Sequence, residues 1–156
     1  MKKLIIGADS AGYELKEAVK QYLEDANISY DDVGAQTADD DKEYYKTACE
    51  AAEGILKGDY EKGLLFCGTG MGMSIVANKF KGIYASVVES IYAAEKCRAI
   101  NNANILCMGG FIVGGKMGIE MVKKFLSTEF TENMDGVEDF LKKAYADIQA
   151  LEEKLF

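Results

Sequence analysis

The chain has 156 residues, of which 49% are apolar and 28% charged, as in an ordinary globular domain with one hydrophobic core. Its formal net charge of −8 argues against binding of nucleic acid through the phosphate backbone, and its lack of histidine excludes Ser-His-Asp catalysis and histidine metal ligands. No apolar run approaches the roughly 20 residues of a membrane span, and no signal peptide is predicted. The cysteines lack C-x-x-C spacing, so no metal site is predicted and a reduced, cytoplasmic setting is expected.

Short apolar runs alternate with longer amphipathic segments along the chain. The runs expected to form strands span residues 3–8, 28–33, 63–66, 83–88 and 104–108. The segments expected to form helices span residues 12–26, 42–57, 70–78, 90–99 and 115–126. Because near-continuous apolar strands alternating with helices are typical of a parallel sheet covered on both faces, the sequence predicts a single α/β domain over residues 1–156.

A final amphipathic segment, residues 135–156, is expected to form a helix beyond the last strand. Asp135 is predicted to cap its start. The apolar residues that recur at helical spacing are Val137, Phe140, Leu141, Tyr145, Ile148, Leu151 and Leu155. Two interpretations stay open, because this helix could dock on a neighbouring molecule or pack on its own sheet.

The most informative stretch is residues 67–74, Cys-Gly-Thr-Gly-Met-Gly-Met-Ser, which directly follows the apolar run 63–66. A buried strand is expected to end in a thiol, cross a glycine-rich loop and enter a helix. A helix start offers free amide donors and partial positive charge, which stabilise a thiolate. We therefore predict that Cys67 is a base or nucleophile and that the hydroxyl of Thr69 passes a proton. The alternative is a small buried apolar residue, our interpretation of the other three cysteines.

Other strand ends carry polar residues, and the carboxyl ends of parallel strands are where ligands bind in such folds. Asp9 could cap the next helix or bind a sugar hydroxyl. The run 101–104, Asn-Asn-Ala-Asn, could turn the chain or hold a polyol through its amides. A dinucleotide-binding motif is disfavoured, because Met73 stands where G-x-G-x-x-G needs its third glycine and the motif does not follow the first strand.

These segments resemble the family of ribose-5-phosphate isomerase B and the galactose-6-phosphate isomerase subunits (RpiB/LacA/LacB). The likeness covers residues 2–130, and it is carried by residues 6–16, 67–79, 102–106 and 127–130. It implies a three-layer α/β/α sandwich with a five-stranded, Rossmann-like parallel sheet, to which this chain adds its C-terminal helix. It also implies a homodimer or homotetramer whose active sites are shared between subunits and need no cofactor.

The implied reaction is aldose–ketose isomerisation through a cis-enediolate. Cys67 would move the proton between C1 and C2, Thr69 would pass the hydroxyl proton, and the amides of residues 68–74 would hold the enediolate oxygen. The implied substrate-binding residues are Asp9, Ser10, Tyr44, Gly68, Gly70, Met71, Gly72, Ser74 and Asn101.

The chain departs from the family pattern at its cationic positions. Ser10 and Ile100 stand where the family has histidines, the second of which opens the sugar ring, and Phe111 stands where it has an arginine. The acidic stretch 131–135 replaces a basic one, and Arg98 is the only arginine. A charge-assisted hydrogen bond contributes roughly 1.5–3 kcal/mol, so these changes would weaken phosphate binding by several orders of magnitude.

We therefore expect a sugar without a terminal phosphate, or an altered one, as the substrate. A neighbouring subunit could still supply a lysine to a phosphate, with Lys116, Lys142 and Lys143 as candidates. The alternative function is a non-catalytic sugar-binding protein or a partner subunit of an isomerase complex.

Overall fold

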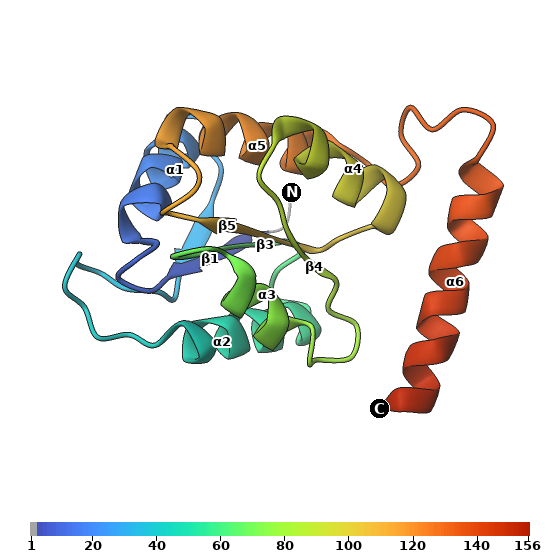
Figure 1. The fold of residues 1–156 in the computed structure, drawn as a ribbon, viewed down its shortest axis with the longest axis horizontal. Helices are drawn as coiled ribbons and strands as arrows, with labels where there is room; N and C mark the ends of the chain where they lie inside the picture. Colours follow the sequence, from blue (N-terminus) through green and yellow to red (C-terminus); the bar gives the residue numbers. More distant parts are fainter. Residues whose placement is uncertain (1–2) are drawn as a thin grey trace.

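The structure is a computed structural model that describes residues 3–156 (Figure 1). The strands are Leu4–Ala8 (β1), Tyr30–Asp32 (β2), Gly63–Cys67 (β3), Ala85–Val87 (β4) and Ile105–Gly109 (β5). The helices are Tyr13–Asp25 (α1), Tyr44–Leu56 (α2), Met71–Ala77 (α3), Ile91–Asn101 (α4), Gly115–Ser127 (α5) and Glu138–Leu155 (α6). Each predicted strand and helix is present, although β2 and β4 are only three residues long. Across residues 3–156, no helix has both the length and the apolar character needed to span a membrane.

The five strands form one parallel sheet in the order β2-β1-β3-β5-β4. Because all the pairings are parallel, the strands end together at one edge, here called the carboxyl edge, and begin together at the opposite, amino edge. Cys67 at the end of β3 pairs with Gly109 at the end of β5. The predicted three-layer α/β fold is thereby confirmed.

Helices cover both faces of the sheet, with α1, α4 and α5 on one face and α2 and α3 on the other (Figure 1). Successive side chains of β3 point to opposite faces, so Leu64 and Phe66 pack with the first group of helices, and Leu65 and Cys67 with the second. Every residue of β1, β3 and β5 is buried. This explains why these strands are apolar without alternation.

Helix α6 stands apart from the three layers and does not lie on the sheet (Figure 1). It is anchored by Leu141, which is buried, and by Tyr145, whose ring lies 5.4 Å from that of Tyr84. Glu152 also accepts hydrogen bonds from the Gly82 amide and the Tyr84 hydroxyl, both at 2.8 Å. The large apolar residues of α6 that remain exposed are Phe140, Ile148, Leu151 and Leu155.

The prediction that Asp135 caps this helix is wrong. The residue before α6 is Val137, and no side chain caps the helix. A tight turn lies between Asp135 and the helix, because Gly136 adopts a left-handed φ of 85° and the Val137 amide donates to the Met134 carbonyl. The local sequence therefore makes a turn where a capping residue was expected.

Candidate active site

The carboxyl edge brings together most of the residues predicted to form the site. Asp9 and Ser10 follow β1, Cys67 ends β3 and Thr69 lies in the turn beyond it. Tyr44 begins α2, and a Cβ at Gly72 would lie only 2.8 Å from its ring. This edge is where side chains from several strand ends can meet one ligand.

Cys67 is the centre of this arrangement. The residue is 5% exposed, and its Sγ accepts a hydrogen bond from the Gly70 amide at 3.2 Å. Gly70 has a left-handed φ of 77°, which turns its amide back toward the sulfur and starts α3 directly afterwards. An N–H donor and the start of α3 thus lie beside the sulfur.

Cys97 and Cys107 contrast with Cys67. Both are buried in the core, as predicted, whereas Cys49 is only half-buried. Burial raises the pKa of Cys97 to about 11 and raises that of Cys107 further. These two thiols are therefore protonated packing residues.

The glycine-rich turn uses some of its own amides. The Met71 amide donates to Thr69 Oγ1 at 3.3 Å, and the Ser74 amide donates to the Gly70 carbonyl at 3.2 Å. The amides of Gly72 and Met73 lie in the first turn of α3, where intrahelical acceptors are lacking. Any oxygen held by this turn therefore depends on only part of the predicted set of amides.

Asp9 and Ser74 already have structural contacts. Asp9 Oδ1 accepts a hydrogen bond from the Gly12 amide at 3.0 Å, so the carboxylate caps the turn before α1 and keeps its second oxygen. Ser74 is 8% exposed, and its Oγ lies 3.4 Å from both the Ala85 carbonyl and Asn78 Nδ2. Ser74 thus faces β4 rather than the open edge.

Asn101 does not join this group within one chain. It is the last residue of α4, and the helices run antiparallel to the strands, so it lies at the amino edge. Arg98 lies on the same helix and is 6% exposed. Its guanidinium donates to the Ala103 carbonyl, the Thr128 carbonyl and Asn102 Oδ1. The single arginine therefore braces the amino edge.

A hollow of 270 Å³ opens at the carboxyl edge beside the glycine-rich turn, and we call it the β1–β5 hollow. It is lined by Ser10, Ala11, Glu14, Leu15, Ala38, Gly110 and Phe111. Phe111 connects it to the turn, because a Cβ at Gly68 would lie 2.6 Å from the Phe111 ring. Cys67 is not among the residues that line this hollow, whereas Phe111 lines it and its ring also lies against the turn that follows the thiol.

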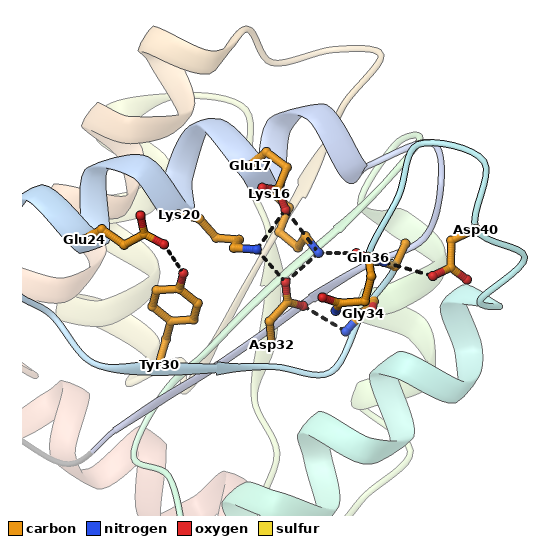
Figure 2. A network of polar contacts seen from close by, with 10 residues as sticks. Lys16, Glu17, Lys20, Glu24, Tyr30, Asp32, Gly34, Gln36 and Asp40 are labelled. Atoms are coloured by element: carbon orange, nitrogen blue, oxygen red, sulfur yellow. Dashed lines mark hydrogen bonds and ion pairs between the residues drawn. The ribbon is translucent and has the colours of Figure 1, made fainter.

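Lys16 supports one wall of the site and was missed by the sequence analysis. Its side chain is fully buried; its Nζ lies 2.6 Å from Asp32 Oδ2 and donates to the Ala35 carbonyl (Figure 2). Asp32 Oδ1 also accepts from the Gly34 amide at 3.0 Å, and the Ala35 amide donates to the Ala8 carbonyl at 2.7 Å. The network ties the segment after β2, which leads to Ala38, against the end of β1. A weak signal was available, since Lys16 lies one turn before the buried Val19 on the apolar stripe of α1.

The chain is similar in sequence to known sugar isomerases. Residues 4–139 match the family model for ribose/galactose isomerases. The chain is 49% identical over 155 residues to 4-deoxy-4-sulfo-D-erythrose isomerase of Clostridium sp. (strain MSTE9), a match covering 99% of this chain and 98% of that protein. D-erythrulose-4-phosphate isomerase 2 of Mycolicibacterium smegmatis is 42% identical over 130 residues, covering 82% of this chain and 86% of the relative.

The fold agrees with the sequence relationship. The structure of Clostridium thermocellum ribose-5-phosphate isomerase B superposes with a TM-score of 0.89 at 31% identity and covers 99% of both chains. The chain therefore belongs to the ribose/galactose isomerase family and is a sugar isomerase.

Proposed function

We propose that this protein interconverts 4-deoxy-4-sulfo-D-erythrose and the corresponding 2-ketose. The observation that carries the proposal is the 49% identity with the sulfo-erythrose isomerase over 155 residues, α6 included. The match with D-erythrulose-4-phosphate isomerase 2 spans only 82% of the chain. A four-carbon sugar with a terminal sulfonate is thus the favoured substrate.

The charges at the site support a sulfonate. A sulfonate carries one negative charge, whereas a phosphate monoester carries close to two at neutral pH. The lining of the β1–β5 hollow includes Glu14 and no lysine or arginine, and Arg98 is committed to the amino edge. The chain itself therefore supplies little to neutralise a dianion.

The chemistry of a C4-sulfonated sugar also explains a missing residue. Free erythrose closes a five-membered ring through its C4 hydroxyl, and a sulfonate on C4 removes that hydroxyl. The aldehyde then stays open-chain, and the enzyme needs no group to open a ring. Ile100, at the position of the family's ring-opening histidine, is compatible with such a substrate.

In the proposed mechanism, the Cys67 thiolate removes the proton from C2 of the aldose and returns it to C1. The C1–C2 enediolate forms between these steps, and the proton of the O2 hydroxyl passes to O1. Thr69 Oγ1 accepts a hydrogen bond from the Met71 amide, which leaves the Thr69 O–H free to donate to O1 and O2 of the sugar. Amides in the first turn of α3 stabilise the charge on the intermediate. The reaction belongs in the cytoplasm, where such a thiol stays reduced.

We further propose that a second copy of the chain completes the site, as a homodimer or homotetramer. Asn101 lies at the amino edge, so it can reach a sugar only in a neighbour's site. The exposed apolar residues of α6 offer surface for such an assembly. The two parts of this proposal are tested separately.

Isotope exchange in deuterium oxide tests the catalytic proposal. The purified protein is incubated with 4-deoxy-4-sulfo-D-erythrose, erythrose 4-phosphate, ribose 5-phosphate and ribose, and deuterium at C1 and C2 is measured by NMR. We expect the fastest exchange with the sulfonate and none in Cys67→Ala. Absence of Cys67-dependent exchange with every sugar would refute the catalytic role and leave a binding role.

Subunit complementation tests the shared site. Cys67→Ala and Asn101→Ala proteins are each expected to be inactive, and mixing them after reversible dissociation should restore activity, because some sites then contain neither substitution. If Asn101→Ala alone keeps full activity, or light scattering shows a monomer, the shared-site proposal fails while the catalytic one stands.

A further inference from the structure

The β1–β5 hollow is where we place the anionic end of the proposed substrate, and its lining has few polar groups for that role. Ser10 contributes one hydroxyl and Glu14 contributes one carboxylate, whereas the other lining residues are apolar or glycine. A second hollow of 280 Å³ shares Glu14, Leu15 and Gly110, and it too is lined without lysine or arginine. Both spaces therefore penalise negative charge.

Phe111 holds a fixed place in this wall. Its amide donates to the Gly68 carbonyl at 2.9 Å, and its ring lies against Gly68, the residue after Cys67. Nevertheless, the residue is 78% exposed. A phenylalanine that buries so little area adds little to folding stability. Its position is better explained by what it presents to a ligand at this edge.

The Phe111 ring and the Glu14 carboxylate both disfavour binding of an anion, and both disfavour a dianion more than a monoanion. The ring displaces water from the anion, which costs more as the charge rises. Glu14 repels a dianion about twice as strongly as a monoanion at the same distance. A sulfonate is a monoanion throughout the physiological pH range, whereas a phosphate monoester loses its second proton near pH 6. The two groups differ chiefly in this second charge.

We propose that Phe111 and Glu14 are specificity-determining residues that make the site select a singly charged terminal group over a doubly charged one. The identity of the substrate rests on the proposed function, but the selection does not require turnover. It is a property of the hollow, and it predicts that a phosphorylated ligand becomes acceptable when its second charge is removed.

Binding of two unreactive ligands tests this selection. The ligands are D-erythritol 4-phosphate and 4-deoxy-4-sulfo-D-erythritol, which carry the anionic group on the same carbon. Neither has a carbonyl group, so neither can isomerise. Calorimetry gives both dissociation constants at pH 7.5 and at pH 5.5 for the wild type, Phe111→Ala, Glu14→Gln and Ile112→Ala. Ile112 neighbours Phe111, is 45% exposed and does not line the hollow, so Ile112→Ala is the matched control.

We expect the wild type to bind the sulfonate at least tenfold more tightly at pH 7.5. At pH 5.5 the preference should shrink by up to roughly 25-fold, because the monoanionic fraction of the phosphate rises by about that factor. Phe111→Ala and Glu14→Gln should each reduce the preference at pH 7.5 at least threefold, and Ile112→Ala should not change it. Melting temperatures identify any variant that has lost its fold.

Further charged groups at this edge are Asp9 after β1, Asp39, Asp40, Asp41 and Lys42 in the loop before α2, Glu89 after β4, and Lys116 in the first turn of α5. Amide hydrogen bonds from Gln36 and Lys42 hold the pKa of Asp40 below its usual value, so it stays ionised at both pH values. Comparing two ligands on one protein also cancels changes common to both.

Equal affinity for the two ligands at pH 7.5, or a preference unchanged in both variants, would overturn the proposal, as would no binding of either ligand by the wild type. A preference that behaves as expected in a protein without Cys67-dependent exchange would refute the catalytic function alone.

Discussion

The two edges of the sheet use polar groups in opposite ways. At the amino edge, the Asn104 side chain accepts a hydrogen bond from the Tyr84 amide and donates one to the Gly82 carbonyl. Arg98 donates hydrogen bonds to three acceptors. Glu152 binds the same segment and fixes α6 to it. At the carboxyl edge, by contrast, the Thr69 hydroxyl and the second carboxylate oxygen of Asp9 keep hydrogen-bonding capacity that the described residues do not use. The polar groups named at the amino edge are used within the chain, whereas the carboxyl edge combines the buried Lys16 network with polar groups that are left for a ligand.

Removing the sulfur at the carboxyl edge should have the largest effect. Cys67→Ala is expected to lower kcat/KM by roughly 10²–10⁴-fold, the usual contribution of a proton-transfer residue. Cys49 is a half-buried residue of α2, so Cys49→Ala should leave kcat/KM within about twofold of the wild-type value. Isomerisation is followed by NMR, with circular dichroism as the check of folding. Activity of Cys67→Ala within tenfold of the wild type would remove the chemical distinction between the edges.

Much of the carboxyl edge could be predicted because its signals are local. The apolar run 63–66 indicates a buried strand, and the three glycines after Cys67 indicate a turn that enters a helix. The strand order is not local, yet parallel pairing places every strand end at the same edge whatever that order is. Asp9 and Cys67 could therefore be assigned to one site without knowing which strands are neighbours.

The features that could not be predicted from the sequence depend on distant contacts. Lys16 is buried only because Asp32 and the Ala35 carbonyl, both in the segment after α1, converge on its Nζ. The position of the Phe111 ring depends on the close approach of two loops. The family resemblance implies that Asn101 binds substrate in a site shared between subunits, and the direction of α4 places it at the amino edge of its own chain.

The Lys16 network offers a second, smaller test at the carboxyl edge. Lys16→Met should destabilise the protein by about 3 kcal/mol, because it leaves the Ala35 carbonyl without its buried donor. Lys20 is the matched control: it pairs with Asp32 at 3.2 Å, but its side chain is 19% exposed. Lys20→Met should therefore cost less than about 1 kcal/mol. Urea unfolding measures the free energy of unfolding of both variants. Equal destabilisation would show that burial of Lys16 does not make its ion pair more important for stability than that of Lys20.

The smallest effect is expected at the amino edge, where Tyr84 anchors α6. Burial and the hydrogen bond to Glu152 raise the pKa of Tyr84. The folded protein thus holds this proton more tightly than the unfolded chain, so the stabilisation is complete below the unfolded pKa of about 10 and is lost as the pH rises above it.

Tyr84→Phe should cost about 1 kcal/mol at neutral pH and weaken the fall in stability above pH 10. Other tyrosines retain part of that fall, because hydrogen bonds to carboxylates, together with burial, raise the pKa of Tyr30 and Tyr60 to about 12. The control is therefore Tyr92→Phe, because Tyr92 is 71% exposed. Chemical unfolding at several pH values measures the difference. If the free energy of unfolding depends on pH identically in the two variants, the contact between Tyr84 and Glu152 does not anchor α6. The polar groups of the amino edge would then not be shown to hold the structure together.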